Sequence, residues 1–192
     1  FAAPAGREHP FFYDAATSVV AGGKLELAGY AGRDIPFGWA KDADYADSAD
    51  AHVLGKGGVL LPLGGTPDGS WHKGHGLAMM VDILSGIVGG NGHSMALASG
   101  GVRHGHVGHF HVSMRIDAFR DRAEWDAEME ALYADVRGST PVEGVAQVLV
   151  PGEKEHHIEA ERRLNGIPLP TRVIEQLEAV GAEVNVAMPS PL

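Results

Sequence analysis

Residues 69–86, GSWHKGHGLAMMVDILSG, place a strong helix signal directly after a group of basic and small residues. Apolar side chains recur in and just beyond this stretch at steps of three and four residues, at Leu77, Met80, Val81, Leu84 and Val88. This is the period of a helix that buries one face. The spacing therefore predicts an amphipathic helix that must pack against another part of the protein.

The residues at the start of this helix suit an anion. Lys73, Gly74, His75 and Gly76 come directly before the periodic apolar positions, so we expect the first backbone N–H groups to be bare there. Those N–H groups, the helix dipole and the Lys73 ammonium all favour a bound anion. The helix start is therefore a candidate anion-binding site.

The rest of the chain mixes strand and helix signals. We expect strands at 10–20, near 24–27, at 58–65, at 108–116 and at 145–153. We expect helices between Asp117 and Gly138, at 155–164 and at 171–180. Residues 29–57, rich in Gly, Asp and Ala, are interpreted as a long surface excursion. The regular strand and helix alternation of a doubly wound parallel sheet is missing, which favours the α+β class.

Composition excludes several classes of function. The 192 residues are 44% hydrophobic, enough for a sizeable core and about one domain. A net charge of −10 with no basic stripe argues against a nucleic-acid partner. The absence of cysteine excludes disulfides, thiolate metal sites and a cysteine nucleophile. No apolar run approaches the length of a membrane span, so we expect a cytoplasmic protein with no membrane partner.

A histidine cluster raises the alternative of a metal-binding protein. His104, His106, His109 and His111 supply four imidazoles within eight residues, and imidazole is a common metal ligand. In 108–116, however, apolar and polar residues alternate strictly, so His109 and His111 form the polar face of the expected strand. No carboxylate or cysteine pattern accompanies the cluster. We therefore expect no metal site here.

Two further motifs are weak when taken singly. DAATS, residues 14–18, offers a carboxylate and two hydroxyls among small side chains, although Thr17 and Ser18 could equally satisfy local backbone groups. VPGEKE, residues 150–155, predicts a tight turn from which Glu153 projects, although it could equally be an ordinary turn in solvent. The usual dinucleotide fingerprint, G-x-G-x-x-G between a strand and a helix, is absent.

Taken in order, the motifs carry a family resemblance. The series DAATS, LLPLGG, HKGHGLAMMVDILSG, VGHFHVSM, VLVPGEKE and ERRLNGIPLP resembles the malate/L-lactate dehydrogenase family of the non-Rossmann kind. Its relatives include ureidoglycolate dehydrogenase, diketogulonate reductase, sulfolactate dehydrogenase and piperideine-2-carboxylate reductase. The resemblance covers about residues 1–180, and the run His72 to Leu77 is its most specific part. His75 departs from the family, which often has an aromatic residue there.

The resemblance implies a fold, a cofactor and a set of contacts. It implies a largely antiparallel mixed sheet flanked by helices, and hydride transfer between NAD or NADP and a small 2-keto acid, 2-hydroxyacid or cyclic imino acid. The positions that match the family's cofactor contacts are Asp14, Ala16, Thr17, Ser18, His72, Lys73, Gly74, Gly152 and Glu153. Nothing in the sequence decides between NAD and NADP.

The resemblance also implies that part of the active site lies outside these residues. The family's acid/base histidine, its companion arginine and a second active-site histidine lie before the point that matches Phe1. We therefore expect 1–150 to be a cofactor-binding domain incomplete at its N-terminus, and 151–192 to be a C-terminal helical segment that packs on the upstream part.

The expected partner is the N-terminal half of the same enzyme, as a separate or cleaved chain, and the combined unit is expected to form a homodimer. Two alternatives stay open. One is a non-catalytic structural subunit of such an enzyme, and the other is the histidine-rich metal-binding protein.

Overall fold

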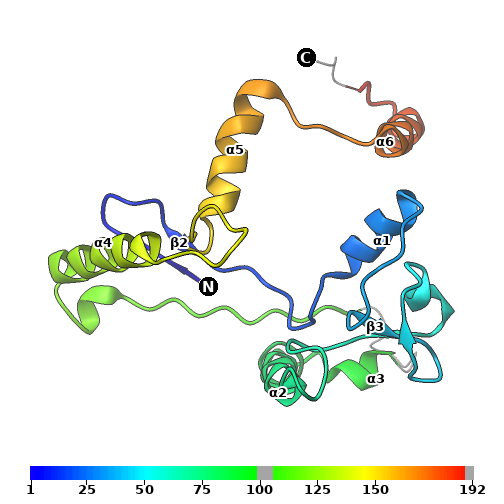
Figure 1. The fold of residues 1–192 in the computed structure, drawn as a ribbon, viewed down its shortest axis with the longest axis horizontal. Coiled ribbons are helices and arrows are strands. Elements are labelled where there is room, and N and C mark those ends of the chain that lie inside the picture. Colours follow the sequence, from blue (N-terminus) through cyan, green and yellow to red (C-terminus); the bar gives the residue numbers. More distant parts are fainter. Residues whose placement is uncertain (99–105, 189–192) are drawn as a thin grey trace. The chain divides into compact units, whose positions relative to one another are not determined.

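The computed structural model describes residues 1–98 and 106–188 (Figure 1). The chain divides into two units. The terminal unit combines Phe1–Asp14 with Met114–Leu192, and the central unit is Ala15–Ser113. The boundaries of these units differ from those of the predicted domains 1–150 and 151–192. The cofactor-binding role of the first domain and the packing role of the second stay predictions. Helices and small antiparallel sheets occur together, which confirms the α+β class.

The sheet of the central unit has three short antiparallel strands. β3 (Ala40–Lys41) is in the middle, between β4 (Asp47–Ser48) and β5 (Val59–Leu60). Ala40 is opposite Ser48 on one side and opposite Leu60 on the other. Beside the sheet lies a core made of Val20, Leu25, Ile35, Ala40 and Val53.

Two expectations for the central unit are wrong. The strand expected near 24–27 is instead part of helix α1 (Gly22–Tyr30), whose sequence KLELA consists of good helix formers. Leu25 on this helix is 1% exposed and belongs to the core. The expected surface excursion, 29–57, contains β3, β4 and the short helix η1 (Val53–Lys56), and it supplies three buried core residues. The free energy gained by burying these few apolar side chains favours an ordered structure although the segment is mostly polar.

The helix expected after residue 70 is present. α2 (Trp71–Val81) continues directly into a π-helix, η2 (Asp82–Val88), and the Asp82 carboxylate then accepts hydrogen bonds from Ser94 at the start of α3 (Ser94–Ala98). The predicted burial of its apolar face is not seen. Leu77, Met80, Val81 and Val88 are 45–61% exposed, and within the described part of the chain only Gly74 and Gly86 of these two elements are buried.

The terminal unit packs helix α4 against a two-stranded sheet. β1 (Ala2–Ala3) pairs antiparallel with β2 (Phe11–Phe12), and the core between the sheet and α4 (Arg122–Gly138) consists of Ala5, Tyr133 and Val150. Asp121 caps α4 by accepting the Ala123 and Glu124 N–H groups. Asp117, where the sequence predicts the start of this helix, instead lies in the short helix η3 (Ile116–Ala118) and pairs with Arg115.

The last two helices agree with the sequence. α5 (Glu153–Asn165) and α6 (Thr171–Glu183) lie at the helices expected at 155–164 and 171–180. Across residues 1–98 and 106–188, no helix combines the length and the apolar character needed to cross a membrane.

The strands expected at 108–116 and 145–153 are not formed in the described residues. Neither segment pairs with another strand as part of a sheet, although Val150 in the second is buried. Alternating side chains fit a strand, but a strand also needs a partner that pairs with its backbone N–H and C=O groups along its length. In the second segment, the Pro151 carbonyl accepts one such bond, from Phe12 of β2.

Candidate functional site

The end of the DAATS segment, Thr17 and Ser18, lies beside residues 61–63 in the central unit. The Thr17 carbonyl accepts the Leu63 N–H at 2.9 Å, and the Val19 N–H donates to the Leu61 carbonyl at 2.8 Å. Between them, Ser18 pairs antiparallel with Pro62. The Ser18 hydroxyl donates to the Val20 carbonyl at 2.8 Å, so it satisfies a local backbone group. Ala16 is exposed, and Thr17 is half-buried.

The start of α2 packs against the same short segment. Gly74 is buried, and a Cβ added to it would overlap the backbone of Leu63. Only glycine allows this approach, so Gly74 is needed for packing within the chain. Because Leu63 also bonds Thr17, the structure brings the DAATS segment and the start of α2 together on one short stretch of chain.

The helix begins earlier than the sequence suggested. Ser70, in the left-handed region at φ 64°, precedes Trp71, and Lys73 lies in the first turn. The Trp71 N–H donates to the Thr66 carbonyl and the Lys73 N–H donates to the Ser70 carbonyl, so these two groups are not bare. For the His72 N–H, the described residues provide no acceptor.

Lys73 is the residue at this helix start that best suits an anion. Its side chain is exposed, and within the described residues its ammonium forms no ion pair. Gly76 faces open space, since no atom lies within 4 Å of a Cβ placed there. An unpaired ammonium beside a helix N-terminus fits a phosphate group of a ligand.

The other predicted residues belong to the terminal unit, where β2 connects them. Gly152 has φ 93°, and a Cβ there would lie 2.9 Å from the Phe12 Cβ. The Phe12 N–H donates to the Pro151 carbonyl at 3.3 Å. Asp14 is exposed and follows β2 by two residues. The nine predicted residues therefore form two groups, one in each unit.

Glu153 does not project into solvent, contrary to expectation. It is 5% exposed, and its carboxylate accepts the Val150 N–H at 2.9 Å and the Arg137 Nε–H at 2.9 Å. Burial opposes ionisation of this carboxyl group, but the Val150 N–H and the Arg137 guanidinium outweigh it and lower the pKa of Glu153. Arg137 was not singled out from the sequence, because its partner lies sixteen residues away and on another helix.

This lowered pKa predicts a loss of stability in acid. The Glu153 contribution is fully present above the unfolded-state pKa, near 4.5, and is lost as the pH falls through the lower folded-state pKa. We expect the free energy of unfolding of the wild type to exceed that of Glu153→Gln at neutral pH, and the difference to shrink below pH 4.5. Urea titrations over this pH range measure it. A difference that stays constant with pH would contradict the assignment.

The histidine cluster shows no metal geometry in its described members. His104 lies outside the described residues. His106, His109 and His111 are exposed, and the His109 and His111 rings stack with centroids 6.0 Å apart. Over residues 1–98 and 106–188, no group of three or more His, Asp or Glu side chains is arranged to hold a metal ion.

The expected absence of a metal site is tested directly with a chelator. We expect EDTA to leave nucleotide binding by the pure protein unchanged, since the site proposed for the nucleotide contains an ammonium and N–H groups that need no metal. Binding is followed by nicotinamide fluorescence, and metal content by elemental analysis. Stoichiometric zinc, nickel or iron that is lost together with binding would overturn the expectation.

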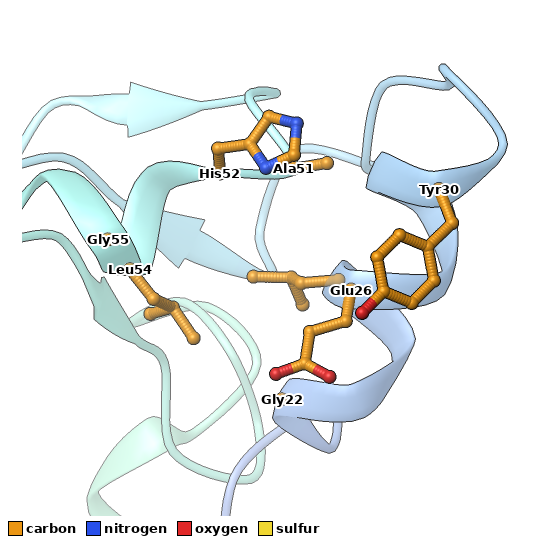
Figure 2. A pocket seen from close by; sticks show the side chains of 8 residues that line it. Gly22, Glu26, Tyr30, Ala51, His52, Leu54 and Gly55 are labelled. Carbon is orange, nitrogen blue, oxygen red and sulfur yellow. The ribbon is translucent and has the colours of Figure 1, made fainter. Parts of the chain in front are cut away.

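A pocket of about 220 Å³ lies beside α1 and was not foreseen from the sequence. Figure 2 shows Glu26 and Tyr30 on α1 and His52 and Leu54 on the segment across from it. Glu26 and Tyr30 are four residues apart, so they are neighbours on the surface of α1. The sequence indicates a strand at 24–27 and therefore does not predict this pair. None of the nine predicted site residues lines this pocket.

A family model and two relatives that match this chain are named as dehydrogenases or reductases. Residues 1–178 match the family model described as malate/L-lactate dehydrogenase. The malate dehydrogenase of Pyrococcus horikoshii is 34% identical over 181 residues, which are 94% of this chain and 50% of that protein. The Delta(1)-pyrroline-2-carboxylate reductase of Ancylobacter novellus is 30% identical over 183 residues, covering 93% of this chain and 49% of that protein.

The fold agrees with these matches. The solved structure of malate dehydrogenase from Pyrococcus horikoshii superposes with a TM-score of 0.83 at 31% identity, and the match covers 98% of this chain and 51% of the other. The chain thus spans about half the length of the relatives it matches. The chain belongs to the malate/L-lactate dehydrogenase family.

Proposed function

We propose that this chain is the cofactor-binding portion of an NAD(P)-dependent oxidoreductase that acts on 2-keto and 2-hydroxy acids or on cyclic imino acids. Membership of a family whose named relatives include a malate dehydrogenase and a pyrroline-2-carboxylate reductase supports the reaction class. The observation that carries the cofactor assignment is the position of Lys73, exposed and unpaired among the described residues, at the start of α2.

We infer that the cofactor is held without a Rossmann fold. In support, every strand pair in residues 1–98 and 106–188 is antiparallel, whereas a Rossmann fold needs a parallel sheet. The chain also lacks the glycine fingerprint of that fold.

Each group of residues has a distinct task in this proposal. Lys73 and the nearby His72 N–H would hold a phosphate, by charge and by hydrogen bonding. The Thr17 hydroxyl and the exposed Asp14 carboxylate would supply a donor and an acceptor for other polar groups of the nucleotide. When bound, the nicotinamide supplies or accepts the hydride.

We propose that the N-terminal half of the enzyme, as a separate or cleaved chain, completes the site, and that the combined unit forms a homodimer. The apolar side chains that α2 and η2 expose support a protein partner, because large exposed apolar patches mark interaction surfaces. The resemblance assigns the acid/base histidine to that upstream half.

Nucleotide titration tests the proposal. The purified protein, with any copurifying subunit retained, is titrated with NADH and with NADPH while the nicotinamide fluorescence is followed. Saturable binding of either nucleotide together with reduction of pyruvate or of Δ1-piperideine-2-carboxylate is the expected result. Binding without turnover in the complete complex would favour the non-catalytic subunit, and no binding of either nucleotide would refute the cofactor assignment.

A further inference from the structure

We infer that Glu153 is a positioning residue, which together with Arg137 fixes the turn at 150–152 against β2, and that Glu153 does not itself touch the nucleotide. The inference rests on the proposed function, because that function assigns this turn to cofactor binding. It replaces the expectation that the Glu153 side chain is one of the cofactor contacts.

The first step is that the Glu153 carboxylate is already used inside the protein. One oxygen accepts the Arg137 Nε–H at 2.9 Å and the other accepts the Val150 N–H at 2.9 Å. With Glu153 only 5% exposed, a ligand would have to break both of these hydrogen bonds to reach its carboxylate. Such a carboxylate holds its own chain in place and does not bind a ligand.

The second step is that Arg137 joins three segments of the terminal unit. Besides the Glu153 contact from α4 to α5, its Nη1 donates to the Glu8 carboxylate at 3.0 Å, in the connection between β1 and β2. Its guanidinium also lies 5.2 Å from the ring centroid of Tyr133, which is fully buried. The Tyr133 hydroxyl donates to the His9 carbonyl at 3.0 Å, in the same connection.

The third step is that the turn itself has little freedom. The Phe12 N–H on β2 donates to the Pro151 carbonyl, and Gly152, at φ 93°, packs so closely on Phe12 that a side chain would not fit. The Glu153 N–H donates back to the Val150 carbonyl at 3.0 Å. Glu153 therefore bonds Val150 through both its N–H and its carboxylate, which closes the turn.

The turn residues that stay accessible are Pro151 and Gly152, and neither has a polar side chain. Pro151 is exposed and Gly152 is half-buried, whereas the side chain of Glu153 points into the protein. A nucleotide at this turn would therefore meet main-chain atoms whose positions are set by Glu153 and Arg137. Preorganised backbone groups bind more tightly than mobile ones, because less entropy is lost on binding.

The experiment compares two variants with two matched controls. Glu153→Gln keeps the shape of the side chain and removes its charge, and Arg137→Met removes the guanidinium. The controls are Glu159→Gln and Arg163→Met, which break an exposed 2.5 Å ion pair on the same helix, α5. Each protein is titrated with NADH and NADPH, and the backbone amide exchange of Phe12 and Val150 is measured by NMR or mass spectrometry.

We expect both test variants to raise the nucleotide Kd about tenfold and to accelerate amide exchange at Val150, while both controls behave as wild type. Arg137→Lys keeps a cation and should fall between wild type and Arg137→Met. The double variant should bind little more weakly than either single variant, because the two residues act on one turn. A role in stability alone would lower the fraction of folded protein and leave Kd unchanged.

Three distinguishable results would overturn the inference or the proposed function on which it rests. If Glu153→Gln weakens binding while Arg137→Met and Val150 exchange match wild type, Glu153 contacts the nucleotide directly. If wild type binds and neither variant changes Kd, the turn is not positioned by this pair. If wild type binds neither nucleotide, the proposed function fails, and the exchange measurements still show whether the pair fixes the turn.

Discussion

The chain expressed by itself is expected to reduce no keto or imino acid with either NADH or NADPH. Reduction of such a substrate needs a proton donor within hydrogen-bond reach of the developing oxygen or nitrogen, and a cation that holds the substrate carboxylate. The family resemblance assigns both to the half of the enzyme before the point that matches Phe1. This chain spans about half the length of its relatives.

The local structure gives a further reason for this expectation. The histidines near the helix start, His72 and His75, lie beside Lys73, which suits a phosphate and not the reacting end of a nicotinamide. The apolar surface of α2 and η2 is also exposed in the described residues, so the isolated chain should associate or aggregate.

The measurement is a steady-state assay with pyruvate, oxaloacetate and Δ1-piperideine-2-carboxylate, using the pure chain with and without a polypeptide that carries the family's N-terminal half. That polypeptide assayed by itself is the control. Turnover is expected only from the combination. Robust turnover by the pure chain would refute the expectation and would require a catalytic histidine among the residues printed here.

Local patterns in the sequence predicted the helices well and the sheets poorly. The apolar period after residue 70 predicts α2 and η2, and the Asn-Gly, Pro and Gly residues that separate the last segments predict α5 and α6. Helical hydrogen bonds are local, so a short window contains most of the information. The strand expected near 24–27 is wrong because Gly22 and Gly23 suggested a turn into a second strand, while the residues that follow favour a helix.

Strand pairing depends on partners that are distant in sequence. β3 pairs with β5 across eighteen residues, and Thr17 bonds Leu63 across forty-six, so neither contact has a local signal. The same limit applies to the candidate site. Motifs in the sequence single out Asp14, Lys73 and Gly152 as candidates, but the pairing of Glu153 with Arg137 joins α5 to α4 and is visible only in the structure.

Replacement of Lys73 by alanine is expected to weaken nucleotide binding by one to two orders of magnitude without loss of the fold. Loss of a charge-assisted contact costs about 1.5 to 3 kcal/mol, which corresponds to roughly a ten- to hundredfold rise in Kd. The Lys73 side chain is exposed, and its ammonium forms no ion pair within the described residues. Its removal should therefore change the free energy of unfolding by no more than about 0.5 kcal/mol.

The control is Lys24→Ala, which removes another exposed lysine of the central unit, on α1, outside the nine predicted positions. Lys24→Ala should bind NADH or NADPH as wild type does, and Lys73→Arg should retain most of the affinity. Salt offers a second test, because screening weakens a charge contact. Raising the ionic strength should reduce binding by wild type more than binding by Lys73→Ala. An unchanged Kd in Lys73→Ala, with an equal salt dependence in both proteins, would rule out a phosphate contact at this helix start.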